Sequence, residues 1–321
     1  MRPGMEKTET GELVARCATL AALLEVSAYP KPGNVHRTRD FPGTRYEHFL
    51  AGGVAMGSAM RRLAVRGFEA ERGLTGWRDI GVGGSVLEAV EDTLSWQRGG
   101  NVNLGVALLF APMAAAGGAA LLDDGTVDAR RLRGKLSHVI DSTTPEDAVA
   151  FYEAIRRAMT PRVLGEVEDL DVLDDSAPDR IREEGLSLKD VFRRCSDRDS
   201  ICFEWVTDFE ITFETGYPYL KRTFEGSDDV NHAVVDTFLH ILSGHPDSLI
   251  RRKSGLERAE EVSRRAQLIL NAGGSRTTEG GDMLRQLDDE LQGAGGDLNP
   301  GTTADLTAAS IFVVLLEGWR P

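Results

Sequence analysis

The segment that decides the fold runs from Leu104 to Leu122 and reads LGVALLFAPMAAAGGAALL. It carries no charged residue and is about long enough to cross a membrane. However, Pro112 and the Gly117–Gly118 pair interrupt it, and alanine outnumbers leucine. We therefore interpret it as a buried central helix and expect no membrane span.

Helical periodicity continues on both sides of this segment. Leu13, Cys17, Leu20 and Leu24 recur at spacings of four, three and four, which places them on one face of a helix. Further helices are expected over about residues 44–66, 85–96, 201–213, 229–242, 255–271, 282–291 and 302–317, and another after Ser142. No series of strands alternates with these helices, so the sequence predicts an all-α fold rather than a doubly wound α/β fold.

Several helix starts are indicated by capping residues. Ser142-Thr-Thr-Pro-Glu-Asp147 offers a hydroxyl cap, a proline in the first turn and carboxylates near the positive helix end. Ser85 with Glu88 has the spacing of a capping box. Thr302 or Thr303 could cap the last helix.

Length and composition limit the classes of protein. We expect one compact domain over residues 1–321, with a variable acidic insertion at about 162–226 and a surface loop from Glu166 to Glu184. The formal net charge is −14 and the pI is about 5.0. This charge disfavours nucleic-acid binding, although a local basic pocket could still hold a small anion.

The cysteines are Cys17, Cys195 and Cys202, and no CxxC pair is present. We expect three free thiols in a cytoplasmic protein, with Cys17 in the core.

Three polar loops interrupt the apolar helices. In Tyr29-Pro-Lys-Pro-Gly-Asn-Val35 the prolines and Gly33 favour a type II turn that could fix Lys31 toward a phosphate. Gly99-Gly-Asn-Val-Asn-Leu-Gly105 leads into the central helix, whose free N–H groups suit an anion. Asn299-Pro-Gly-Thr-Thr-Ala-Asp305 places a carboxylate suited to Mg²⁺ near the start of the last helix. Each loop could equally be an ordinary turn or helix cap.

Two further groups could bind a ligand. Arg251-Arg-Lys-Ser-Gly255 is a basic cluster suited to a polyphosphate or carboxylate, or to solvent, and Asp247 could anchor it. His232, Asp236 and His240 share a helix face at metal-ligand spacing. We favour ordinary hydrogen bonding for these three residues, since no further ligand is evident.

In this order, the segments resemble those of the triphosphoribosyl-dephospho-coenzyme A synthase family. The family's glutamate and Pro-Lys-Pro-Gly correspond to Glu25 and residues 30–33, and its Gly-x-Asn-Thr-x-x-Gly to Gly99, Asn101 and Gly105, with Val102 replacing threonine. Asp247, Ser248 and residues 251–255 match a basic segment of the family, and Asn299–Gly301 with Ala304–Leu306 match its last motif. The order agrees over roughly residues 10–318.

The resemblance implies an all-α enzyme that transfers the triphosphoribosyl group of ATP to dephospho-coenzyme A and releases adenine, with Mg²⁺ as cofactor. It also implies roles for individual residues. Glu25 and Asp305 would be catalytic and would bind the metal, with Glu25 as general base or metal ligand. The implied substrate-binding residues are Lys31, Asn34, Asn101, Asn103, Arg251, Arg252, Lys253, Asn299 and Thr302.

The chain departs from the family in three places. Family enzymes carry Gly-x-His-x-Asp-Met where this chain has Phe41–Phe49, and His-Lys where it has Asn103–Leu104. The region 162–226 lacks the Gly-Ala-Arg-Gly-Glu stretch of the family. The acceptor could therefore be another cofactor precursor such as a pterin, and a non-catalytic nucleotide-binding protein is a further alternative.

Overall fold

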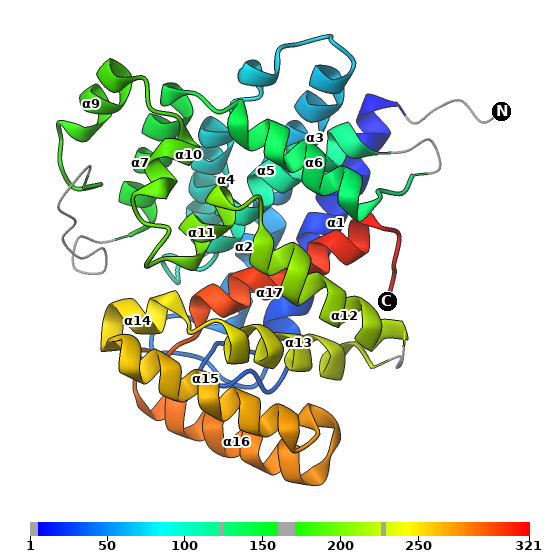
Figure 1. Cartoon of the computed structure of the whole chain (residues 1–321), viewed down its shortest axis with the longest axis vertical. Coiled ribbons are helices and arrows are strands. Elements are labelled where there is room, and N and C mark those ends of the chain that lie inside the picture. The colour runs from blue at the N-terminus through cyan, green and yellow to red at the C-terminus, as the bar shows by residue number, and fades with distance from the viewer. Residues whose placement is uncertain (1–5, 122–124, 160–170, 226–228) are drawn as a thin grey trace.

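The structure is a computed structural model that describes residues 6–121, 125–159, 171–225 and 229–321. Within these ranges it contains helices, turns and two isolated β-bridges, His36–Arg39 and Phe41–Thr44, and no sheet. The prediction of an all-α fold is confirmed (Figure 1).

The α-helices in chain order are α1 (Lys7–Ser27), α2 (Tyr46–Ala55), α3 (Gly57–Glu71), α4 (Val82–Trp96), α5 (Leu104–Ala120), α6 (Ala129–Asp141), α7 (Pro145–Ala158), α9 (Ala177–Glu184), α10 (Leu188–Arg193), α11 (Ser200–Val206), α12 (Tyr217–Glu225), α13 (Val230–Gly244), α14 (Ser248–Ser254), α15 (Leu256–Asn271), α16 (Thr278–Gly293) and α17 (Gly301–Leu316). Two short 3₁₀ helices, η1 (Trp77–Asp79) and η3 (Gly274–Arg276), and a π-helix, η2 (Ile211–Gly216), complete the set.

Helix α5 is the buried central helix that the sequence predicts. All its residues except Gly105 are buried, and it packs on α1, α3, α4, α6 and α17. A Cβ atom on Gly118 would lie 1.9 Å from the carbonyl oxygen of Ala64, and one on Gly67 would lie 1.9 Å from that of Ala115. Glycine is therefore required where the backbones of α3 and α5 touch, which explains one of the two glycines that interrupt the apolar run.

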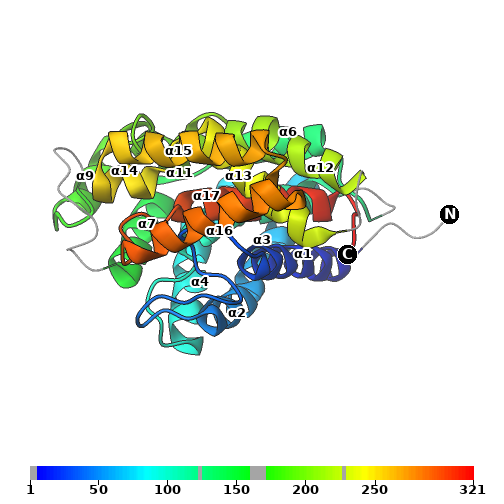
Figure 2. The same ribbon diagram turned by 90° about the horizontal axis from the view of Figure 1, so that it is seen from below.

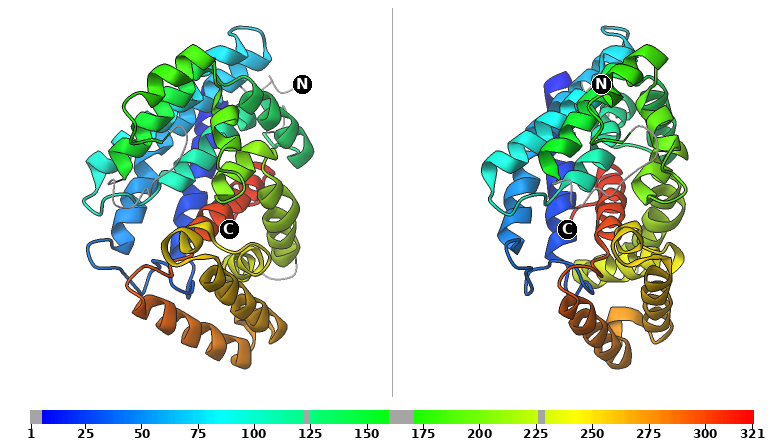
Figure 3. Two further views of the ribbon diagram at one scale, coloured as in Figure 1. Left: turned by 60° about the vertical axis from the view of Figure 1, so that its left-hand side comes forward. Right: turned by 90° about the vertical axis from the view of Figure 1, so that its left-hand side faces the viewer.

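Helix α17 lies between two groups of helices. In Figure 2, α13, α14 and α15 lie on one side of it, and α1, α2 and α4 lie on the other. Both views in Figure 3 bring the α1–α2 loop next to the segment that precedes α17. No helix in the described part of the chain is long and apolar enough to cross a membrane.

Several local predictions are confirmed. Thr144 caps α7 and forms a capping box with Asp147, and α1 ends before Tyr29-Pro30 as expected. The expected helix 201–213 is helical only in part: α11 ends at Val206 and η2 begins at Ile211, and Asp208 and Phe209 between them have positive φ.

Other local predictions are wrong. Ser85 does not cap a helix, because α4 begins at Val82 and the Ser85 hydroxyl donates to the Gly81 carbonyl, 3.1 Å away. The expected helix 44–66 is two helices that meet at Met56. The expected surface loop Glu166–Glu184 contains α9, while its residues 166–170 lie outside the described residues.

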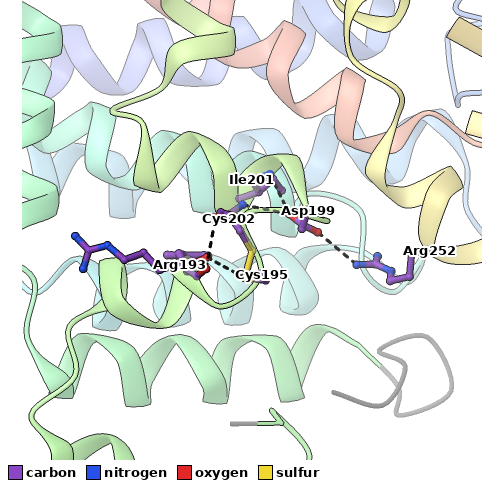
Figure 4. Close-up of a disulfide and its surroundings, with 8 residues drawn as sticks. Arg193, Cys195, Asp199, Ile201, Cys202 and Arg252 are labelled. Atoms are coloured by element: carbon purple, nitrogen blue, oxygen red, sulfur yellow. Dashed lines mark hydrogen bonds and ion pairs between the residues drawn. A yellow bond between two sulfur atoms is a disulfide. The ribbon is translucent and has the colours of Figure 1, made fainter. Parts of the chain in front are cut away.

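The expectation of three free thiols is also wrong. Cys195 and Cys202 form a disulfide, and only Cys17 is free and buried (Figure 4). The turn between α10 and α11 reverses the chain and brings the Cα atoms of the two cysteines within 5.8 Å. Their separation of seven residues gave no sign of this reversal.

Candidate active site

The loop after α1 forms the type II turn expected from its prolines. The Asn34 N–H donates to the Lys31 carbonyl at 3.2 Å, and Gly33 has φ +73°. Glycine suits this position because other residues rarely adopt positive φ. The two prolines restrict the backbone on either side of Lys31.

Lys31 points into the protein and pairs with Glu25. The lysine is fully buried, Glu25 is 5% exposed, and the Lys31 ammonium donates to Glu25 Oε1. Asn34 Oδ1 lies 3.4 Å from Lys31 Nζ, and the Asn34 amide donates to Asn299 Oδ1 at 3.0 Å. The structure therefore brings together four predicted site residues, Glu25 from the end of α1, Lys31 and Asn34 from the first polar loop and Asn299 from the third.

The carboxylate of Asp305 connects the second and third loops. It lies in the second turn of α17, because the helix begins at Gly301. A Cβ atom on Gly105 would lie 2.0 Å from Asp305 Oδ2, so this carboxylate rests directly on the first turn of α5. Glycine at position 105 leaves the room that the carboxylate occupies.

Asp247 anchors α14 to α17, in agreement with the predicted anchoring role. Its Oδ1 accepts the N–H groups of Leu249 and Ile250 at 2.8 and 3.1 Å. Its Oδ2 accepts the Thr303 N–H at 2.7 Å and the Thr303 hydroxyl at 2.8 Å. The prediction that Thr302 or Thr303 caps α17 is therefore wrong, because Thr303 donates to Asp247 and Thr302 accepts from Ser248 at 3.1 Å.

Burial changes the acid strength of these groups. It raises the pKa of Glu25 and lowers that of Lys31, because each charge loses its hydration, although the ion pair partly offsets this loss. Asp305 keeps some contact with solvent, yet its pKa is raised well above the ordinary value. Burial is the largest cause, followed by the charges of Glu25, Asp247 and Asp199. Three neighbouring acids thus favour a proton or a cation at Asp305.

Sequence analysis missed Asp288, a residue of α16 that binds the loop after α1. Its Oδ1 accepts the Gly33 N–H at 3.0 Å, and its Oδ2 lies 3.2 Å from His36 Nε2 and 3.6 Å from Arg39 Nε. Asp288 lies on the buried face of α16 with Leu284 and Leu291. A carboxylate within that apolar stripe is the signal that could have identified it.

The remaining predicted residues make contacts of their own. Asn101 is exposed, and its side chain accepts the N–H of Leu104, the first residue of α5, at 3.2 Å, while Asn103 is the N-cap residue of this helix. Asn103 packs against α2, where its side-chain oxygen accepts the Gly53 N–H at 3.0 Å and its amide nitrogen donates to the Val102 carbonyl at 3.0 Å. In the basic cluster, Arg251 donates to the Asp197 carbonyl at 2.9 Å, Arg252 pairs with Asp199 at 3.7 Å, and Lys253 donates to the Gly296 carbonyl at 2.9 Å.

His232, Asp236 and His240 do not form a metal site. His232 Nδ1 lies 2.8 Å from the Ser275 hydroxyl, Asp236 accepts the Ser275 N–H at 2.8 Å, and His240 stacks on Tyr219. This agrees with the ordinary hydrogen bonding favoured from the sequence. No group of three or more His, Cys, Asp or Glu side chains in the described ranges is arranged to hold a metal ion.

The fold and these loops define an all-helical protein with a buried acid–lysine centre beside two helix N-termini. Residues 11–321 match the family described as ATP:dephospho-CoA triphosphoribosyl transferase. Because the match covers nearly the whole chain, the protein belongs to this family.

Individual relatives support the same family. The chain is 35% identical over 96 residues to the 2-(5''-triphosphoribosyl)-3'-dephosphocoenzyme-A synthase of Klebsiella pneumoniae, which is 30% of this chain and 31% of that protein. It is 32% identical over 109 residues to a candidate enzyme of the same name from Pseudomonas syringae pv. tomato, covering 34% of this chain and 37% of that one. The matched part therefore spans about a third of the curated relatives.

A solved structure agrees over a larger part of the chain. A crystal structure of a candidate triphosphoribosyl-dephospho-CoA synthase from Archaeoglobus fulgidus superposes with a TM-score of 0.63 at 28% identity. The superposition covers 86% of this chain and all of the archaeal one.

Proposed function

We propose that this protein transfers the triphosphoribosyl group of ATP to a ribose hydroxyl of dephospho-coenzyme A and releases adenine. The observation that carries the proposal is the buried Glu25–Lys31 pair together with the Asp305 carboxylate on the first turn of α5, in a chain that matches the family over residues 11–321. Transfer breaks the glycosidic bond of ATP and forms a new bond from the same sugar carbon to the acceptor oxygen.

Two carboxylates suit this chemistry. Glycosidic bonds break through an oxocarbenium-like state, which nearby carboxylates stabilise while they move protons. The acceptor hydroxyl must lose a proton as it attacks, and adenine must gain one as it leaves. Glu25 and Asp305 have raised pKa values, so either can exchange a proton closer to neutral pH than an ordinary carboxylate.

Lys31 and the basic cluster are assigned to the triphosphate. Lys31 pairs with Glu25, and Arg251, Arg252 and Lys253 lie on α14, which Asp247 ties to α17. Guanidinium groups bind phosphate oxygens in pairs, and an ammonium group binds them as a point charge. Asn34, Asn101, Asn103, Asn299 and Thr302 remain candidates for contacts with the sugar or base.

The residues present fit a magnesium ion that is shared with substrate. Mg²⁺ is commonly held by one or two carboxylates together with phosphate oxygens. Glu25 and Asp305 supply two such carboxylates, and the acidic surroundings of Asp305 favour a cation there. When bound, the ion would neutralise charge on the triphosphate.

The test is release of free adenine from ATP with magnesium, in the presence and absence of dephospho-coenzyme A. We expect adenine only when the acceptor is present. Release without acceptor would contradict the assigned acceptor and indicate a glycosidase-like activity. ATP binding with no adenine in either mixture would contradict the reaction itself and favour a nucleotide-binding protein.

The roles of the carboxylates are tested with Glu25→Gln and Asp305→Asn, which keep the size of each side chain. Each should lower turnover on the order of 100-fold. Asp289→Asn is the matched control, because Asp289 is an exposed carboxylate that pairs with Arg39 on the surface of α16. Near-normal turnover in either site variant would overturn the assigned role.

A further inference from the structure

The disulfide closes a short loop beside the basic cluster of α14. Cys195 lies just after α10, and Cys202 lies in the first turn of α11. Between them, Asp199 caps α11, since its Oδ1 accepts the N–H groups of Ile201 and Cys202 at 2.9 and 3.2 Å. Figure 4 shows the disulfide next to Asp199, which contacts the start of α11 and faces Arg252.

This loop contacts the basic cluster twice. The Asp197 carbonyl accepts a hydrogen bond from Arg251 Nη1 at 2.9 Å. The Asp199 carboxylate lies 3.7 Å from Arg252 Nη1, and the two side chains are 25% and 36% exposed. Two of the three cations assigned to the triphosphate are therefore already engaged, and both partners come from within the disulfide-closed loop.

The loop also places a negative charge beside the basic cluster, because the Asp199 carboxylate faces Arg252. A triphosphate carries several negative charges, so a fixed carboxylate at this point opposes its binding.

We propose that the loop closed by Cys195 and Cys202 is a redox-controlled cover over the triphosphate subsite. The identity of the anion rests on the proposed function. In the disulfide form, Asp199 competes with phosphate for Arg252, while the Asp197 carbonyl holds Arg251. Reduction frees the loop and leaves both guanidinium groups available to the anion.

The reduction needs a dithiol, which supplies two electrons and two protons. One thiolate of the reductant attacks Sγ of Cys195, the more exposed of the two cysteines, so the S–S bond breaks and Cys202 leaves as a thiolate. The second thiol of the reductant then displaces Cys195 and forms the reductant's own disulfide. Cys195 and Cys202 each end as a protonated thiol.

The experiment measures binding of inorganic tripolyphosphate by calorimetry, with the protein oxidised and after reduction with dithiothreitol. Loss of one partly exposed ion pair predicts that the reduced protein binds about three- to fivefold more tightly. The double variant Cys195→Ser/Cys202→Ser should bind like the reduced protein and should not respond to dithiothreitol. Equal affinity in the two redox states would overturn the inference.

Two variants of the loop separate the ion pair from general charge. Asp199→Asn keeps a good helix cap but removes the charge that faces Arg252, so the oxidised variant should bind tripolyphosphate like the reduced protein. Asp197→Asn removes an equal charge from the same loop and keeps the carbonyl contact, so its affinity should stay within about twofold of the parent. If both variants bound tripolyphosphate more tightly by the same factor, the change in affinity would come from net charge, and the proposed cover would be overturned.

Adenine release from the same preparations distinguishes this inference from the proposed function. Redox-dependent binding of tripolyphosphate without adenine release would contradict the reaction and support the cover. Adenine release with redox-independent binding would support the reaction and overturn the cover.

Discussion

At the scale of single residues, the site depends on charges held where water is largely excluded. Lys31 is fully buried and is neutralised by Glu25, with Asn34 as a further neighbour. Removing one member of such a pair leaves an uncompensated buried charge, which costs about 3–5 kcal/mol. The pair is therefore both part of the proposed site and a condition for folding of the loop.

The first prediction concerns Gly105. In Gly105→Ala, the added methyl group would meet the Asp305 carboxylate and displace it from α5. We expect adenine release to fall on the order of 10- to 100-fold, because a displacement of about 1 Å is enough to impair catalysis. The assay is turnover alongside the melting temperature.

Gly84→Ala is the matched control for this change. Gly84 also lies in the first turn of a helix, and nothing lies within 4 Å of a Cβ atom added there. It should leave turnover unchanged and, if anything, stabilise α4. Normal turnover in Gly105→Ala would contradict the placement of Asp305.

At the scale of elements, buried carboxylates tie together helices that are distant in sequence. Asp247 joins α14 to α17, and Asp288 joins α16 to the loop after α1. Glu204 in α11 accepts the Ile211 N–H at 2.7 Å, the Thr212 N–H at 3.0 Å and the Thr212 hydroxyl at 2.5 Å, and so holds η2. The positions of these elements therefore depend on particular acids as well as on apolar packing.

The second prediction concerns the bonds of Asp288. Asp288→Asn would turn an amide donor toward the Gly33 N–H or toward His36, which leaves a buried donor unpaired. We expect a loss of about 1–3 kcal/mol in unfolding free energy and lower turnover as the Lys31 turn shifts. The measurements are denaturant unfolding and adenine release.

The neighbouring Asp289→Asn serves as the control for Asp288→Asn. Asp289 is exposed and forms a surface pair with Arg39, which contributes less than about 1 kcal/mol. Equal losses in the two variants would show that Asp288 has no special role.

The third prediction concerns the pH dependence of stability. Burial raises the pKa of Glu204 from 4.5 to about 7, so the folded protein keeps this proton at pH values where the unfolded chain has lost it. The stabilisation is complete below pH 4.5 and is lost as the pH rises through about 7. The contribution of Glu204 to the unfolding free energy should differ by about 3 kcal/mol between pH 4.5 and pH values above about 7.

Unfolding free energies measured from pH 4.5 to 8 test this contribution. Glu204→Gln should remove the fall in unfolding free energy between pH 4.5 and about 7. Glu214 is an exposed carboxylate of η2 that pairs with Arg133, so Glu214→Gln should keep this fall. An unchanged slope in Glu204→Gln would contradict the raised pKa.

At the scale of the whole molecule, the net charge of −14 means that negatively charged side chains repel one another and destabilise the folded state. Salt screens this repulsion, since the Debye length falls from about 10 Å at 0.1 M to about 3 Å at 1 M. The buried pair of Glu25 and Lys31 is screened far less, because it lies out of contact with the solvent.

The fourth prediction follows from this charge. The melting temperature should rise between 0.1 and 1 M NaCl at pH 7, by about 2–4 °C for each kcal/mol of repulsion removed. At pH 5, near the pI of about 5.0, the net charge is small and the increase should be absent. An equal increase at both pH values would indicate a salt effect other than charge screening.

The sequence by itself determined the class of fold, the central helix and the turn at Lys31. Each follows from local rules: an apolar run too interrupted for a membrane, helical periodicity on both sides of it, and a Pro-Gly pair that favours one turn. The resemblance of its motifs to those of the family also indicated Glu25, Lys31, Asn34, Asn299 and Asp305 as a group.

Only the tertiary structure decided what these residues touch. Asp305 rests on Gly105, 200 positions earlier, Asp288 holds Gly33 and His36, and the Cys195–Cys202 loop reaches Arg251 and Arg252. Such contacts depend on how helices pack, and helix periodicity and capping carry no information about partners that are distant in sequence. For the same reason the sequence could not show that Thr303 donates to Asp247 or that the two cysteines meet.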